Sequence, residues 1–209
     1  MNNKIILNED ELTLKLSPEQ DNLIIETLKQ IIKNLKEKNF NEIIEIVNNS
    51  FHKLPLRALG EGNTKISDIY FLYATALKEN NSDKKLIINY AKMSYQFNRL
   101  NRNALWLIRE VQSIFSDKTQ LLRLQVLGKL FRYYKTELIT DTFKTIYTVA
   151  AENQDDAINY IKDIERPEII QDIQVVKVFN LGNRPELPQG IYETIRLIQW
   201  FDENDFKKN

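Results

Sequence analysis

The sequence contains no cysteine and one histidine, His52, and both shortages limit the chemistry open to it. Without cysteine the chain has no disulfides, no thiolate metal ligands and no cysteine nucleophile. A serine triad or an imidazole metal site would have to use His52, but Ser50 does not share its helix face. We interpret His52 as an ordinary residue near a helix end. We therefore predict no catalytic residue, no metal and no cofactor, and a protein that is not an enzyme.

Long apolar runs and glycine-rich loops are also missing. No apolar stretch approaches the roughly 20 residues that cross a bilayer, and the segment MNNKIILNEDEL has too short an apolar run for a secretion signal. Gly60-Glu61-Gly62 lacks the third glycine and the Lys-Ser or Lys-Thr pair of a phosphate-binding loop. We expect a folded cytoplasmic protein with no membrane partner. Its wealth of Asn, Ile and Lys is typical of an AT-rich bacterial or phage genome.

The acidic clusters at 9–11, 155–156 and 202–203 do not have the alternating ligand spacing of a calcium loop. Solvation of turns and helix starts explains each of them. A hydrolase that uses His52 or an acidic pair is a third functional alternative. It would need a fold that brings distant carboxylates or a serine around His52.

The chain has no net charge, with 29 basic and 29 acidic residues, but the charges are unevenly distributed. Residues 84–135 contain eleven basic residues against two acidic ones, a net charge of +9. The remaining residues contain 18 basic and 27 acidic ones, a net charge of −9. A basic, aromatic-rich middle between acidic flanks favours a binding surface.

Apolar periodicity predicts the secondary structure of the first part of the chain. Alternating apolar and polar residues predict a short β-hairpin from the strands Lys4–Leu7 and Glu11–Leu16. Ser17 and Pro18 are typical of a helix start, and a helix to about Lys38 follows. Its apolar residues recur at spacings of three and four and predict one buried stripe. This stripe consists of Ile24, Leu28, Ile31, Ile32 and Leu35.

Helical spacing continues through the middle of the chain. A helix is predicted at about Asn41–His52, and four more follow a loop over residues 55–67. The joints between these four helices are short, which makes sequential helices antiparallel neighbours. The four are predicted at Ser67–Glu79, Ser82–Phe97, Arg102–Phe115 and Lys118–Leu138.

The pattern changes near Asp141 to a strand, a helix and a strand. The strands are predicted at Phe143–Ala150 and Ile173–Leu181, and the helix at Asn153–Ile164, with Asn153 as its cap. The final element, Ile191–Phe201, fits either a strand or an amphipathic helix. These elements predict a small C-terminal α+β module.

The middle helices resemble a tetratricopeptide repeat, whose period is about 34 residues. The resemblance covers roughly residues 64–136, and the family usually has small residues where this chain has Leu86 and Met93. It implies a curved helical scaffold that binds another macromolecule through its concave face. The positions laid on the pattern are Tyr70, Tyr73, Ala74 and Leu77 in the first helix, Leu86, Tyr90 and Met93 in the second, Asn98 where the family often has a proline, and then Leu107, Val111, Leu124 and Leu127.

Together these patterns predict a mainly α fold. We expect an antiparallel, tetratricopeptide-like array of helical hairpins with a short N-terminal β-hairpin and a small C-terminal α+β module. The predicted domains are residues 1–138 and 139–209.

The basic middle supplies the candidate binding residues. Arginine suits carboxylate or phosphate recognition through paired donors, and exposed aromatic residues anchor protein partners or stack on bases. The alternative is that the aromatic residues belong to the core and the charges line a solvated face. The candidate partner-binding residues are Arg99, Arg102, Trp106, Arg109, Arg123 and Arg132.

We predict a non-enzymatic adaptor or regulatory protein that binds an acidic protein surface through this basic middle. The alternative is a nucleic-acid-binding protein that uses the same residues. A protein partner is preferred because acidic flanks would repel an extended polyanion, and because no sequence signature of a nucleic-acid-binding fold is present. The sequence does not predict an oligomeric state.

Overall fold

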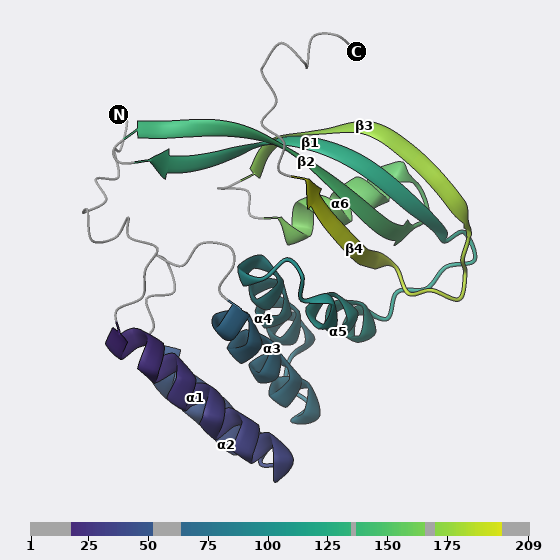
Figure 1. Cartoon of the computed structure of the whole chain (residues 1–209). Coiled ribbons are helices and arrows are strands. Elements are labelled where there is room, and N and C mark those ends of the chain that lie inside the picture. Colours follow the sequence, from purple (N-terminus) through teal and green to yellow (C-terminus); the bar gives the residue numbers. More distant parts are fainter. Residues whose placement is uncertain (1–17, 52–63, 135–136, 166–169, 198–209) are drawn as a thin grey trace, which may run out of the picture. The chain divides into compact units, whose positions relative to one another are not determined.

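The computed structural model describes residues 18–51, 64–134, 137–165 and 170–197 (Figure 1). The predicted N-terminal hairpin, His52 and Gly60-Glu61-Gly62 lie outside these residues. Contacts within the chain divide it into two units, Met1–Asn98 with Lys135–Glu137, and Arg99–Tyr134 with Leu138–Asn209. The second unit thus begins at Arg99, whereas the sequence analysis placed a boundary after residue 138.

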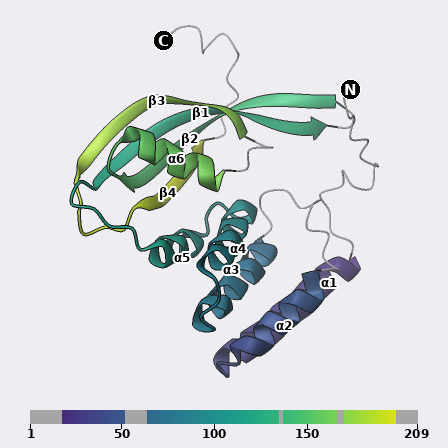
Figure 2. The same ribbon diagram turned by 180° about the vertical axis from the view of Figure 1, so that it is seen from behind.

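In the part of the first unit that the structure describes, the elements are four helices. Consecutive helices pack as hairpins, α1 on α2 and α3 on α4, and α3 also contacts α1 and α2 (Figure 2). The buried stripe of α1 contains Ile24, Thr27 and Ile31, whereas Ile32 is exposed. The helices are α1 (Pro18–Lys36), α2 (Phe40–Phe51), α3 (Thr64–Glu79) and α4 (Lys84–Phe97).

Aromatic rings fill the contact between α3 and α4. The Tyr70 ring stacks on Phe97 at 5.4 Å and on Tyr90 at 5.9 Å, measured between ring centroids. Asp83 starts α4, because its side chain accepts hydrogen bonds from the next amides, those of Lys85 and Leu86. Apolar and aromatic contacts of this kind occur between the helices of any amphipathic helical hairpin. The resemblance to a tetratricopeptide repeat therefore stays a prediction.

Tyr73 gives the first unit a testable response to alkaline pH. Its hydroxyl donates to Asn48 Oδ1 at 2.8 Å, and burial raises its pKa to about 12. In the unfolded chain the pKa of a tyrosine is about 10. The contribution of the protonated Tyr73 hydroxyl to the unfolding free energy is therefore complete below pH 10, and it is lost as the pH rises through the pKa of the folded state. In Tyr73→Phe we expect the alkaline loss of unfolding free energy to shrink by on the order of 1–2 kcal/mol. Urea unfolding between pH 8 and about 11.5 measures this, and parallel pH curves for the two proteins would contradict it.

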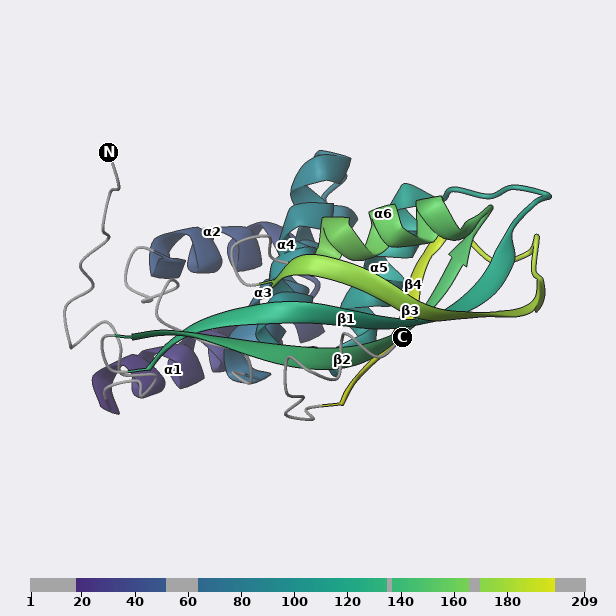
Figure 3. The ribbon, with the colours of Figure 1, turned by 90° about the horizontal axis from the view of Figure 1, so that it is seen from above.

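The second unit contains two helices and four strands in the residues that the structure describes. The strands form one antiparallel sheet in the order β3-β1-β2-β4. Because β1 lies between β2 and β3, the segment β2-α6-β3 is a split βαβ unit, and α6 lies along one face of the sheet (Figure 3). The elements are α5 (Arg102–Gln112), β1 (Gln120–Tyr134), β2 (Glu137–Ala151), α6 (Gln154–Ile164), β3 (Ile170–Asn183) and β4 (Gly190–Leu197).

The predicted helix Lys118–Leu138 is wrong, because its residues form β1 and the start of β2. Leu122, Leu124 and Val126 are buried and alternate with the more exposed Arg123 and Gln125, which is the period of a strand. The mainly α fold class is therefore wrong as well, since a four-stranded antiparallel sheet organises the second unit. The element that follows α5 in the chain is strand β1, where the sequence predicted a further helix of the array.

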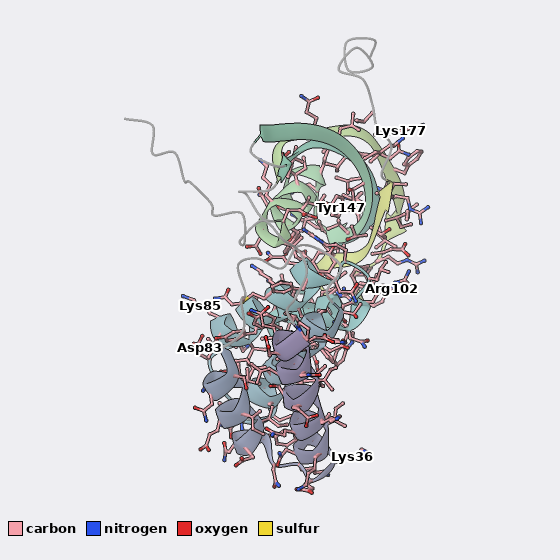
Figure 4. All side chains as sticks on the ribbon, turned by 60° about the vertical axis from the view of Figure 1, so that its left-hand side comes forward. Lys36, Asp83, Lys85, Arg102, Tyr147 and Lys177 are labelled. Atoms are coloured by element: carbon pink, nitrogen blue, oxygen red, sulfur yellow. The ribbon has the colours of Figure 1, made fainter. Side chains whose placement is uncertain are left out.

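The later elements follow the sequence prediction more closely. Asn153 caps α6 as predicted, since its side chain accepts the Asp156 amide at 2.9 Å. The undecided final element is a strand, β4, up to Leu197. Figure 4 shows Tyr147 between the curved sheet and α6, where its side chain is 1% exposed. The core of this unit thus lies on the α6 side of the sheet.

Candidate partner-binding site

Helix α5 carries the candidate site; a side chain caps its first turn, and a left-handed residue ends its last turn. Asn101 accepts a hydrogen bond from the Ala104 amide at 3.2 Å, which satisfies one free donor of the first turn. At the other end Ser113 adopts a left-handed conformation, with φ of 51°, and its amide donates to Arg109. This left-handed residue ends the helix before the predicted Phe115. The buried face of α5 contains Ala104, Leu105, Leu107, Ile108 and Val111.

A second face of α5 lines a pocket within the second unit. Trp106, Arg109, Glu110 and Ser113 follow one another at spacings of three, one and three, so they share one side of the helix. The pocket has a volume of about 330 Å³, and Trp106 is 52% exposed. We call it the aromatic pocket; its lining is Trp106, Arg109, Glu110, Ser113, Phe115, Pro188 and Tyr192.

The Arg109 side chain is a fixed part of the pocket wall. The residue is 7% exposed, and its guanidinium donates a hydrogen bond to the Ile191 carbonyl. The guanidinium carbon lies 3.8 Å from the centre of the Tyr192 ring, a cation–π contact. Burial lowers the pKa of Arg109, and Tyr192 opposes that shift. Arg109 therefore holds β4 against α5 rather than projecting into solvent.

One backbone hydrogen bond ties the residue before β4 to the segment after α5, and one side-chain hydrogen bond ties Tyr192 of β4 to the preceding loop. The Gln189 amide donates to the Ile114 carbonyl at 2.7 Å, and the Tyr192 hydroxyl donates to the Pro188 carbonyl at 2.9 Å. Burial raises the pKa of Tyr192, although Arg109 lowers it. The far wall of the aromatic pocket is therefore positioned by the same contacts that attach β4 to α5.

Arg99 is engaged inside the second unit. Its guanidinium lies 2.8 Å from a carboxylate oxygen of Glu165, and the two side chains are 9% and 2% exposed. Tyr147 donates to the other oxygen of the same carboxylate at 2.5 Å. This buried ion pair joins the start of the unit to the end of α6 and leaves little of Arg99 for a partner.

The remaining predicted residues do not form one cluster. Arg102 is 74% exposed and lies 2.7 Å from Glu193 on β4 (Figure 4). Arg123 is exposed on β1, while the side chain of Arg132 lies outside the described residues. The structure thus brings Trp106 and Arg109 together in the aromatic pocket and places Arg99 and Arg123 elsewhere in the unit.

Sequence reasoning missed the part of the pocket that is distant in sequence. Phe115 is 59% exposed directly after α5, and an apolar Ile114-Phe115 pair just past a helix end was an available signal. The sequence contains no signal that would assign Pro188 and Tyr192 to the pocket, because no local pattern pairs them with α5. Only the fold shows that they face Trp106.

Comparison with protein-family models, with curated proteins and with solved structures gives no match. Among the described residues, no three histidine or acidic side chains gather where they could hold a metal ion. No helix in the described part of the chain has both the length and the apolar character to cross a membrane.

Proposed function

We propose that this chain is a non-enzymatic adaptor or regulatory protein that binds a protein partner through the aromatic pocket. The observation that carries the proposal is the exposure of two large aromatic side chains in one pocket, Trp106 at 52% and Phe115 at 59%. Exposed aromatic residues that gather in one concave place are typical of partner contacts, where Trp and Tyr supply much of the binding energy.

Rigidity supports the same assignment. Tyr192 is fixed by Arg109 and by Pro188, so a partner side chain entering the pocket meets a wall that is already in place. Binding to an ordered surface costs less conformational entropy than binding to a mobile one. The exposed Arg102 lies one helical turn before Trp106 and would face an acidic group of the partner.

Removal of the two exposed aromatic side chains should remove the partner. In the double variant W106A/F115A we expect at least about a 30-fold loss of affinity, because each truncation at a binding centre costs about 2 kcal/mol or more. The measurement is affinity capture from native lysate, split into nuclease-treated and untreated halves, with tagged wild-type and variant protein, followed by mass spectrometry and titration of the retained protein.

Phe179→Ala is the matched control, because Phe179 is also an exposed aromatic residue of the second unit but does not line the pocket. This variant should retain the partner at the wild-type level. Equal capture by wild type and W106A/F115A would contradict the pocket assignment. Retention that disappears with nuclease would contradict the protein partner.

A further inference from the structure

The outward face of strands β1 and β3 is a second surface, separate from the aromatic pocket. Arg123 pairs with Phe179 in the sheet register, and Gln125 pairs with Lys177. Directly opposed residues point to the same face, and the intervening Leu124 is fully buried on the other face. Figure 4 shows Lys177 pointing away from the sheet, on the side opposite Tyr147. Gln174 pairs with Leu127, which lies two residues after Gln125 on β1 and therefore on the same side of the sheet. We call the surface of Arg123, Gln125, Gln174, Lys177 and Phe179 the β1–β3 face.

An aromatic ring lies exposed on this face beside a cation. Phe179 is 37% exposed, although a phenylalanine usually gains about 1.5–3 kcal/mol from full burial. The Lys177 ammonium lies 4.6 Å from the centre of its ring. The cross-strand partner Arg123 adds a second exposed cation. The ring is thus partly exposed, with the Lys177 ammonium over it and an exposed arginine at the paired position of β1.

Acidic residues are absent from the segments that build this face. Residues 120–127 and 173–183 contain no aspartate or glutamate, and they include the amide side chains of Gln125 and Gln174; the acidic residue of β3, Asp172, directly precedes the second segment. On the other edge strand of the sheet, the Glu193 carboxylate is paired with Arg102. The charge of the β1–β3 face is therefore positive and complementary to an anionic ligand.

We propose that the β1–β3 face binds single-stranded nucleic acid. Arg123 and Lys177 contact phosphates, a base stacks on the Phe179 ring, and the amides of Gln125 and Gln174 bond to base edges. An open sheet with an exposed ring and flanking cations suits unpaired bases, because stacking on a side chain needs a base that is free of its partner strand. An acidic protein surface would use the two cations but would gain no stacking on the ring.

The inference does not depend on the proposed adaptor function. The β1–β3 face and the aromatic pocket share no residue, so variants of one surface leave the other intact. Trp106→Ala is therefore the control for an exposed aromatic residue away from the β1–β3 face. Lys85→Glu, at an exposed position in the first unit, is the control for a change of charge.

Fluorescence anisotropy with the full chain tests the proposal. The probes are a fluorescein-labelled oligothymidylate of about 15 nucleotides, the same length of abasic strand, a duplex, and a labelled oligoglutamate. We expect the oligothymidylate to bind more tightly than the other three. Binding should weaken about tenfold in F179A and F179L, as the loss of one stacked base predicts, and should be retained in F179Y. Binding of the abasic strand should not change in these variants.

The charge variants provide the second arm of the test. R123E/K177E should weaken oligothymidylate binding by at least about tenfold, and K177Q should reduce the dependence of log K on log salt by about 0.7. W106A and K85E should bind as the wild type does. The proposal would be overturned if oligoglutamate bound as tightly as oligothymidylate, or if F179A and W106A lost the same amount of oligothymidylate affinity. Absence of oligothymidylate binding at about 50 mM salt would also overturn it.

Discussion

Replacing Glu165 with alanine is expected to lower the unfolding free energy of the second unit by about 3–5 kcal/mol. The Glu165 side chain is 2% exposed and receives both the Arg99 guanidinium and the Tyr147 hydroxyl. Its removal takes away the carboxylate beside the buried Arg99 guanidinium and the acceptor of the buried Tyr147 hydroxyl. Either group costs free energy when it is desolvated and unpaired. The loss therefore exceeds that of a surface salt bridge, which is about 0–1 kcal/mol.

The matched measurement separates the ion pair from simple loss of volume. Trp106 belongs to α5 in the second unit, so urea unfolding followed by tryptophan fluorescence reports on that unit. The exposed pair offers the control, because Glu193→Ala removes the partner of Arg102 and should cost less than about 1 kcal/mol. Joint replacement in R99M/E165L should recover much of the loss, since apolar residues of similar volume replace both members of the buried ion pair. Equal costs for Glu165→Ala and Glu193→Ala would contradict this account.

Local signals predicted the helices well, and the reasons are visible in particular residues. Asn153 has both the side chain and the position of a helix cap, and α6 starts after it. The start of α5 at Arg102 was also predicted, whereas its end was placed too late at Phe115. Nothing in the apolar spacing marks Ser113 as left-handed, because that conformation depends on how the chain leaves the helix.

Strand β1 shows why the fold class was missed. Leu124 and Leu127 are three apart and suit a helix, while Leu122, Leu124 and Val126 alternate and suit a strand. The two periods overlap in this short apolar segment. Pairing with β3 on one side and β2 on the other decides the outcome, and both partners follow later in the chain. Long-range pairing of this kind leaves no local signature.

The sequence predicted only those parts of the candidate site whose residues lie close together along the chain. Trp106 and Arg109 lie three residues apart on one helix, and both were named from the sequence. Arg99 was placed on the same surface, but its partner Glu165 lies 66 residues further on, and only the fold brings them together. A charged side chain is expected at the surface from sequence alone, but here burial makes Arg99 part of an internal ion pair.

A substitution of Gly190 is expected to destabilise the second unit strongly, because a side chain at this position would strain the backbone and would also collide with Arg109. Its φ is +134°, a region that residues with a Cβ rarely adopt, and an added Cβ would lie 3.0 Å from Arg109 Cγ. Arg109 cannot easily move aside, since its guanidinium is bonded to the Ile191 carbonyl and packed on Tyr192. We expect Gly190→Ala to cost about 2–4 kcal/mol, combining backbone strain with overpacking.

Gly182 is the matched control for the strain alone. Its φ is +111°, but an added Cβ there would meet nothing within 4 Å, so Gly182→Ala should cost only about 1–2 kcal/mol. Unfolding by urea with tryptophan fluorescence measures both variants. In an Arg109→Ala background the excess cost at Gly190 should disappear, because the atom that it contacts is gone. If the excess persists without Arg109, the contact between α5 and β4 is not what requires glycine at this position.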